Sequence, residues 1–279
     1  MLNLQTIHKP KTLDQALRLA REPDTAFMAG GTGLISEKRR AVRAVIDLSA
    51  LDLAFIETRG EDIFIGATTT LATVADSPLL REIADGVVAQ AAHRTHANIL
   101  RNQATAVGTI LSEPDGIFSV ALSALDARLT LATLKDSRVE NGDVSLTDLF
   151  AQRGTRLPNS ILTEITIPAS ALARRGVIET VARTPRDKAI VSVCAALEME
   201  RGVVRAGAIA LGGVAETAWR ARDAEREMLN QGLSDDVIQR AAMAATSGLN
   251  PRGDFRGSAE YRIEMARVLT ARALRELAK

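Results

Sequence analysis

Cysteine and aromatic residues are scarce in this chain of 279 residues. The single cysteine, Cys194, excludes an intrachain disulfide and an iron–sulfur cluster held by several thiolates of this chain. Because Cys194 lies in the apolar run 190–197, we interpret it as a buried core residue rather than a nucleophile. Aromatic residues make up only 3% of the chain, which argues against a surface for stacking nucleic-acid bases.

A strong net charge and long apolar runs are also missing. The net charge of +1 provides no field that attracts nucleic acid or an anionic membrane surface. No run of about eighteen apolar residues is present, so no membrane span is predicted. Residues 1–10 lack the apolar core of a signal peptide. Together with the lone cysteine, these features predict a cytoplasmic protein without nucleic-acid or membrane partners.

Hairpin patterns recur between helical patterns and predict the α+β class rather than a doubly wound parallel sheet. Two strand patterns flank a polar turn at 59–62, and two longer ones flank Arg201-Gly202. Asn141-Gly142 is typical of a further turn. The predicted strands are 26–29, 45–48, 55–58, 63–66, 127–134, 161–167, 190–200 and 203–211.

Capping residues mark the expected helices. Thr12 and Gln15 have capping-box spacing ahead of an apolar stripe that runs to Ala20. Further helix starts are expected at Ser77-Pro78, near Pro114, at Ser234 and at Ser258.

The length fits two packed domains, and a stretch of small residues and arginines at 169–176 separates them. We therefore expect one domain at 1–170, made of two subdomains, and a smaller α+β domain at 176–279.

Two segments have the composition of ligand-binding loops. In Ala29-Gly30-Gly31-Thr32-Gly33, three glycines follow a predicted strand, so the backbone can turn tightly and offer N–H groups to a pyrophosphate. The same pattern is common in ordinary turns, and the spacing is not that of a Rossmann fingerprint. Residues 101–110 form a second polar segment, which reads as a loop that lines a ligand or simply connects two elements.

Acid–base machinery is not evident in the sequence. His93 and His96 have the spacing of one helical face, but two histidines without a third ligand do not make a zinc site. We identify no catalytic residue and no metal site, which favours cofactor chemistry or no reaction.

Taken together, the segments resemble the medium, FAD-binding subunit of the xanthine dehydrogenase and carbon monoxide dehydrogenase family of molybdenum hydroxylases. Ala29-Gly30-Gly31-Thr32 is similar to the family's first flavin loop, and 101–105 to the start of its second. Residues 121–127, 183–193, 210–215 and 254–262 resemble four further family segments in the same order. Ordered matches along almost the whole chain are more specific than one glycine loop.

The resemblance implies a two-part FAD-binding domain of the PCMH/VAO-like type, followed by the smaller C-terminal domain. It implies FAD at the domain junction and two partners: a small subunit with 2Fe-2S clusters and a large subunit with the molybdenum cofactor. The flavin would pass electrons from the clusters to NAD, oxygen or another acceptor. The implied cofactor contacts are Ala29, Gly30, Gly31, Thr32, Gly33, Leu34, Thr105, Gly108, Thr109, Asp115, Arg183 and Asp187.

The departures from the family pattern fall at the flavin site. Gly33 stands where the family usually has aspartate or serine, and Val107 replaces a loop glycine with a branched side chain. Ile117 stands where an aspartate is usual, with Asp115 nearby, and Thr180 replaces a lysine. Two hypotheses follow: an electron-transfer flavoprotein subunit with an altered FAD site, or a flavin-free relative with a structural role or another ligand.

Overall fold

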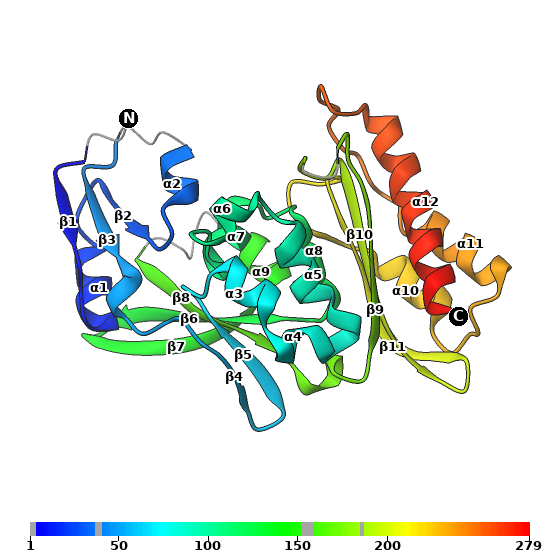
Figure 1. Cartoon of the computed structure of the whole chain (residues 1–279), viewed down its shortest axis with the longest axis horizontal. Coiled ribbons are helices and arrows are strands. Elements are labelled where there is room, and N and C mark those ends of the chain that lie inside the picture. Colours follow the sequence, from blue (N-terminus) through cyan, green and yellow to red (C-terminus); the bar gives the residue numbers. More distant parts are fainter. Residues whose placement is uncertain (1–3, 37–40, 152–158, 185–186) are drawn as a thin grey trace.

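The chain folds around three β-sheets that follow one another along its length (Figure 1). The computed structural model describes residues 4–36, 41–151, 159–184 and 187–279. One small parallel sheet and two antiparallel sheets, all packed with helices, confirm the predicted α+β class. Among these residues, no helix is long and apolar enough to cross a membrane.

The first sheet is parallel and has the order β1-β3-β2. Thr12 caps its crossover helix by accepting a hydrogen bond from Gln15 N at 3.2 Å, while Gln15 Oε1 accepts one from Lys11 N at 3.0 Å. The bond to Thr12 confirms the predicted helix start, although Gln15 bonds Lys11 N rather than the Thr12 N of a complete capping box. The elements are β1 (Thr6–His8), α1 (Leu13–Leu19), β2 (Thr25–Met28), α2 (Thr32–Ser36), β3 (Ala44–Asp47) and the 3-10 turn η1 (Leu48–Ala50).

The central sheet is antiparallel and has the order β4-β5-β8-β6-β7. Its strands are β4 (Ile56–Arg59), β5 (Asp62–Gly66), β6 (Arg128–Lys135), β7 (Arg138–Ser145) and β8 (Ser160–Ile167). Its helices are α3 (Leu71–Asp76), α4 (Pro78–Glu82), α5 (Val87–Arg94), α6 (Asn98–Arg101), α7 (Ala106–Ser112), α8 (Ile117–Ala124) and α9 (Leu146–Ala151), with the 3-10 turn η2 (Ile83–Gly86). The predicted hairpin around the polar turn at 59–62 and the Ser77-Pro78 helix start are confirmed.

The predicted turn at Asn141-Gly142 is wrong, because both residues lie inside β7. The chain reverses at Asp136 and Ser137, whose φ angles are 46° and 64°. Lys135 pairs with Arg138, so these two residues make a two-residue hairpin turn that needs positive φ at both positions.

Three further expectations change between residues 93 and 117. The second polar segment is largely helical rather than a loop, since α6 ends at Arg101 and α7 begins at Ala106. The helix expected near Pro114 begins at Ile117. His93 lies in the last turn of α5, whereas His96 lies beyond that helix with a φ of 59°, so the two do not share a helical face.

The C-terminal sheet is antiparallel and has the order β12-β11-β10-β9. The long hairpin around Arg201-Gly202 is confirmed, and β9 is an additional strand that begins inside the predicted boundary stretch. Ser234 and Ser258 cap helices as predicted. The elements are the 3-10 turn η3 (Ala169–Ala171), β9 (Arg175–Val181), β10 (Val191–Glu200), β11 (Val203–Gly212), β12 (Trp219–Arg220), α10 (Arg222–Met228), α11 (Asp235–Ala244) and α12 (Ala259–Leu277).

Both faces of the C-terminal sheet are buried. One face packs on α8, where Cys194, Ala196 and Ala210 join the core of the central part. The other face packs on α10, α11 and α12 through side chains such as Val193 and Leu211 (Figure 1). Burial on both sides explains the unbroken apolar run of β10. It raises the pKa of the Cys194 thiol to about 12, as expected for an inert core residue.

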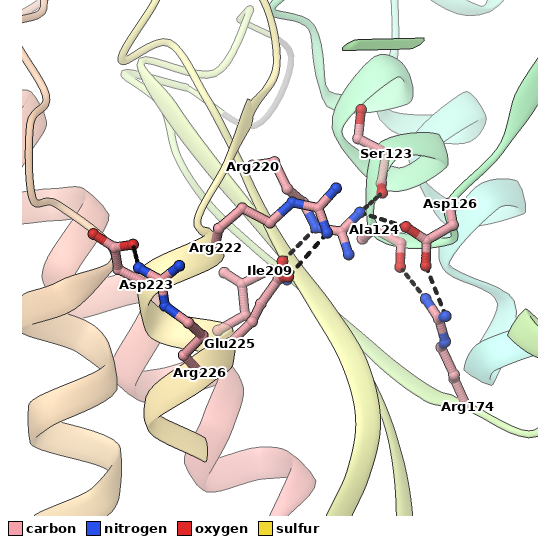
Figure 2. Close-up of polar contacts among 10 residues, drawn as sticks. All are labelled: Ser123, Ala124, Asp126, Arg174, Ile209, Arg220, Arg222, Asp223, Glu225 and Arg226. Atoms are coloured by element: carbon pink, nitrogen blue, oxygen red, sulfur yellow. Dashed lines mark hydrogen bonds and ion pairs between the residues drawn. The ribbon is translucent and has the colours of Figure 1, made fainter. Parts of the chain in front are cut away.

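A buried ion network joins the central part to the C-terminal sheet (Figure 2). Asp126, just after α8, accepts from Arg220 of β12 at 2.6 Å and from Arg174 at 2.7 Å. Arg220 also pairs with Glu225 of α10 and donates to Ser123 O at 2.9 Å. The network crosses the boundary between the two parts, so it fixes their relative position by charge as well as by apolar packing.

Candidate functional site

A cleft of about 560 Å³ separates the first sheet from the central part. One wall consists of residues 25–34, with Ile46 and Leu48 beneath them. The opposite wall is formed by the start of α7, by residues 67–68 and by residues 159–162 at the start of β8. A cleft between two such units, with a volume in the range of cofactor pockets, is the leading candidate for a binding site.

The glycine segment ends β2 and begins α2. Gly31 has a φ of +73°, which L side chains rarely adopt. A β-carbon on Gly30 would lie only 1.6 Å from the carbonyl oxygen of Gln103. Gly30 therefore allows the glycine segment to touch the segment that leads into α7, and this contact brings the two walls of the cleft together.

Several residues that line this cleft have backbone N–H groups without an acceptor among the described residues. The first turn of a helix leaves its N–H groups without intrahelical partners. At the start of α2 these belong to Thr32, Gly33 and Leu34, which line the cleft. None of the hydrogen bonds within the described residues uses them as donors. They provide neutral donors of the kind that hold phosphate oxygens.

On the opposite wall, α7 offers fewer donors. Ala106 N donates to Thr69 O at 2.8 Å, and Val107 N donates to Ala67 O at 3.3 Å. The N–H of Gly108 has no acceptor among the described residues. The hydroxyl of Thr105, whose residue is 5% exposed, has no hydrogen-bond partner in the described part of the chain either. A buried hydroxyl without a partner is costly, so its place in the lining indicates a ligand that completes it.

Val107 does not close the cleft. Its side chain joins the hydrophobic core of the central part, and only 5% of the residue is exposed. Val107 lines the cleft, and most of its surface is covered by core residues, so the cleft stays open beside it.

Charged side chains are absent from the described lining of the cleft. Gly33 supplies no side-chain oxygen, and a β-carbon on it would lie 3.2 Å from Ser112 Cβ on the other wall. A bound anion would therefore be held here by N–H groups and hydroxyls rather than by ion pairs.

The structure brings most of the predicted contacts together. Ala29 to Leu34, Thr105 and Gly108 line the cleft. Thr109 is buried beside it without lining it. The positions of Thr68 and Asn159 in the lining were not predicted, since they come from connections with no motif of their own. No sequence pattern predicts the positive φ of 65° at Asn159 either.

Asp115, Arg183 and Asp187 lie outside the described lining. Asp115 pairs with Lys188 at 3.0 Å, across the junction between the central part and the C-terminal sheet. Arg183 and Asp187 form an ion pair at 3.4 Å, and both side chains are exposed. Their assignment as cofactor contacts stays a prediction.

Family comparisons cover nearly the whole chain. Residues 2–170 match the FAD binding domain in molybdopterin dehydrogenase, and residues 177–277 match the CO dehydrogenase flavoprotein C-terminal domain. The chain belongs to the family of molybdenum hydroxylase FAD subunits. The predicted family is thereby confirmed, and the chain carries that family's FAD-binding domain.

Individual relatives align over similar lengths. The glyceraldehyde dehydrogenase medium chain of Sulfolobus acidocaldarius is 28% identical over 97% of each chain. The 6-hydroxypseudooxynicotine dehydrogenase complex subunit alpha of Paenarthrobacter nicotinovorans is also 28% identical, over 94% of this chain and 90% of its own. A solved structure of carbon monoxide dehydrogenase from Hydrogenophaga pseudoflava contains a chain that superposes with a TM-score of 0.87 at 28% identity, covering 97% of this chain and 96% of that one.

The residues of the cleft fit FAD. Unpartnered N–H groups on both walls and the buried hydroxyl of Thr105 suit a pyrophosphate, which needs several donors in a small volume. Apolar side chains such as Phe27 and Leu48 suit the less polar parts of a dinucleotide. These features belong to the domain that the family uses for FAD.

Proposed function

We propose that this chain binds FAD in the cleft and acts as the electron-transfer flavoprotein subunit of a molybdenum hydroxylase. The observation that carries the proposal is the buried, unpartnered Thr105 hydroxyl, set among free backbone N–H groups in a family FAD-binding domain. We further propose residues 1–170 as the FAD-binding domain and 176–279 as the C-terminal domain.

The residues of the cleft bind and orient the cofactor. The N–H groups of Thr32, Gly33 and Leu34 would hold the pyrophosphate from one wall, and Gly108 N with the Thr105 hydroxyl would hold it from the other. Ala29, Gly30 and Gly31 shape the turn that places these donors. Each net hydrogen bond contributes about 1 kcal/mol, and bonds to a charged group contribute more. FAD itself supplies the redox chemistry.

Proton transfer is not assigned to a residue of the cleft. Its described lining holds hydroxyls and amides but no histidine, carboxylate, lysine or arginine. The chain therefore contributes binding, orientation and an apolar enclosure for the cofactor.

The partners follow from the family. Relatives are named as a medium chain and as a subunit of a complex. We propose an iron–sulfur small subunit as the electron donor to the flavin and a molybdenum-cofactor large subunit as the site of hydroxylation. NAD, oxygen or another acceptor would then take electrons from the flavin.

A second candidate is a flavin-free structural subunit. The uncharged lining of the cleft favours it, because no ion pair would hold the pyrophosphate. The unpartnered Thr105 hydroxyl favours FAD, since a purely structural protein gains nothing from leaving it unsatisfied.

An absorbance spectrum decides between these candidates. The protein is purified, incubated with FAD and desalted. We expect a flavin spectrum that persists, with about one FAD per chain. A protein that stays colourless after loading would overturn FAD binding and leave the structural role.

The substitution Thr105→Val tests the site itself. Valine has nearly the same shape but no hydroxyl, so the FAD-free protein should be equally stable or up to about 1 kcal/mol more stable. FAD should bind about fivefold more weakly, which corresponds to about 1 kcal/mol. Thermal melting without FAD and fluorescence titration with FAD measure the two effects.

Thr95→Val is the matched control. Thr95 is buried outside the cleft, and its hydroxyl donates to Ala91 O at 2.8 Å. Its replacement should lower stability slightly and leave FAD affinity unchanged. If Thr105→Val destabilises the FAD-free protein as much as Thr95→Val does, the Thr105 hydroxyl already has a hydrogen-bond partner without FAD. That result would contradict its assignment as a ligand contact.

A further inference from the structure

The end of α7 places a second hydroxyl in the cleft. Ser112 is the last residue of this helix, and it is exposed where it lines the cleft. Among the described residues, its hydroxyl makes one hydrogen bond, to Thr109 O at 3.4 Å. A hydrogen bond of this length is weak, so the hydroxyl can turn toward a ligand at little cost.

Ser112 shares one face of α7 with two contacts of the proposed FAD site. Thr105, Gly108 and Ser112 are three and four positions apart, which is the spacing of one helical face, and all three line the cleft. A β-carbon on Gly108 would lie only 2.6 Å from Thr105 Oγ1, so the bare backbone there leaves room for the Thr105 hydroxyl. The face therefore offers a hydroxyl, bare backbone and a second hydroxyl, in that order.

The opposite wall leaves space for the Ser112 side chain. Gly33 does not have the positive φ of Gly31, and it has no backbone contact as close as that of Gly30. A β-carbon on Gly33 would lie 3.2 Å from Ser112 Cβ and 3.8 Å from Ser112 Oγ. A side chain at position 33 would therefore crowd Ser112. At this point of the cleft, α7 supplies the side-chain oxygen that Gly33 does not.

The spacing along α7 suits two neighbouring phosphates. Residues four positions apart on a helix, such as Gly108 and Ser112, have β-carbon positions about 5–6 Å apart. One hydrogen bond of an O–H group spans only about 2.7 Å. A phosphate held by Thr105 and Gly108 N thus leaves the Ser112 hydroxyl for the adjoining polar group. Because Ser112 lies opposite Gly33, between the two walls proposed to hold the pyrophosphate, that group is the second phosphate.

We propose that Ser112 is a further cofactor-binding residue, whose hydroxyl donates to the phosphate of FAD that Thr105 does not hold. α7 then holds both phosphates from one face, one through Thr105 and Gly108 and the other through Ser112. The inference rests on the proposed function, because it requires FAD in the cleft. It adds a side-chain contact that neither flavin-loop pattern of the sequence includes.

The test compares FAD binding by Ser112→Ala, Thr105→Val and the double variant. Alanine removes only the hydroxyl and is a better helix former than serine, so the melting temperature of FAD-free Ser112→Ala should not fall. In a fluorescence titration, each single substitution should weaken FAD binding about fivefold. Because the two hydroxyls hold different phosphates, their effects should multiply to about twenty-fivefold in the double variant.

Ser123→Ala is the matched control. Ser123 also lies in the last turn of a helix, α8, and it is half-buried outside the described lining of the cleft. Its substitution removes a hydroxyl of the same kind, so it should leave the FAD affinity unchanged.

Three results would overturn the inference. If Ser112→Ala binds FAD as tightly as the parent protein, its hydroxyl does not hold the cofactor, although the proposed function stands. If the double variant binds FAD no more weakly than Thr105→Val, the two hydroxyls do not hold separate phosphates. A parent protein that stays colourless after loading with FAD overturns the proposed function and the Ser112 contact together. The absorbance spectrum of the parent protein therefore distinguishes failure of the cofactor site from failure of this one contact.

Discussion

Replacing Gly30 with alanine is expected to abolish stable FAD binding. The new β-carbon would lie 1.6 Å from Gln103 O, far inside van der Waals contact. That carbonyl has little room to withdraw, since the adjacent Ala104 N donates to Leu100 O at 2.7 Å and Ala104 O accepts from Leu71 N at 2.8 Å. The two walls must therefore separate, which displaces the N–H groups of both.

We expect Gly30→Ala to lower the free energy of unfolding by about 3 kcal/mol, as overpacking against backbone does. The protein should keep no flavin after desalting under conditions where the parent protein does. Urea unfolding and the absorbance spectrum measure these two quantities.

Gly142→Ala separates this effect from a general cost of alanine. Gly142 lies in β7, and a β-carbon added there would have no neighbouring atom within 4 Å, so the change should be neutral or stabilising by a few tenths of a kcal/mol. If Gly30→Ala folds with parent stability and retains FAD, contact between the two segments does not organise the cleft.

The local signals in this sequence predicted local structure well. Thr12, Ser234 and Ser258 each cap a helix as expected, because a cap depends on residues three positions away. The turn predicted at Asn141-Gly142 was wrong, because the position of the hairpin turn is decided by how β6 pairs with β7. The register places Asp136 and Ser137 at the reversal, and aspartate tolerates the positive φ required there.

The candidate site was predicted only in part, because local sequence patterns do not show which distant segments come into contact. The glycine pattern located one wall, but the contact of Gly30 with Gln103 O joins segments more than seventy residues apart. Val107 replaces a loop glycine, and at the helical start of α7 its side chain both lines the cleft and packs in the core of the central part. No spacing rule in the sequence conveys the direction of that side chain.

The ion network across the domain boundary was not predicted from the sequence. Asp126, Arg174 and Arg220 are separated by 48 and 46 positions, and charged residues so far apart carry no periodic signal. The fold brings them together between α8 and β12 (Figure 2). Both guanidinium groups are largely buried, with 7% of the Arg174 side chain and 12% of the Arg220 side chain exposed.

Asp126→Asn is expected to lower the free energy of unfolding by about 2 kcal/mol. Asparagine keeps the positive φ of 54° at this position, so the change removes charge without straining the backbone. The Arg174 and Arg220 side chains, 7% and 12% exposed, would lose their shared carboxylate. Breaking a buried pair costs about 3–5 kcal/mol, and the partial exposure of Asp126 and the remaining Glu225 reduce that figure.

The contacts of Asp126 with Arg174 and Arg220 also predict that the stability of the protein depends on pH. Burial alone would raise the pKa of Asp126, but the charges and hydrogen bonds of Arg220 and Arg174 outweigh burial and hold it below its ordinary value. A carboxyl with a lowered pKa stabilises the fold above about pH 4 and loses that contribution as the pH falls further. The stability of the parent protein should therefore decline below about pH 4, and that of Asp126→Asn should decline less.

Asp223→Asn provides the control, because Asp223 of α10 pairs with Arg226 on the exposed surface of the same domain. Loss of that exposed pair should cost at most about 0.5 kcal/mol. Urea unfolding at pH 7 and pH 3 measures all three proteins. If Asp126→Asn and Asp223→Asn lower stability equally at pH 7, the network contributes no more than a surface pair, and other contacts, chiefly the apolar packing of α8 against the C-terminal sheet, hold the two parts together.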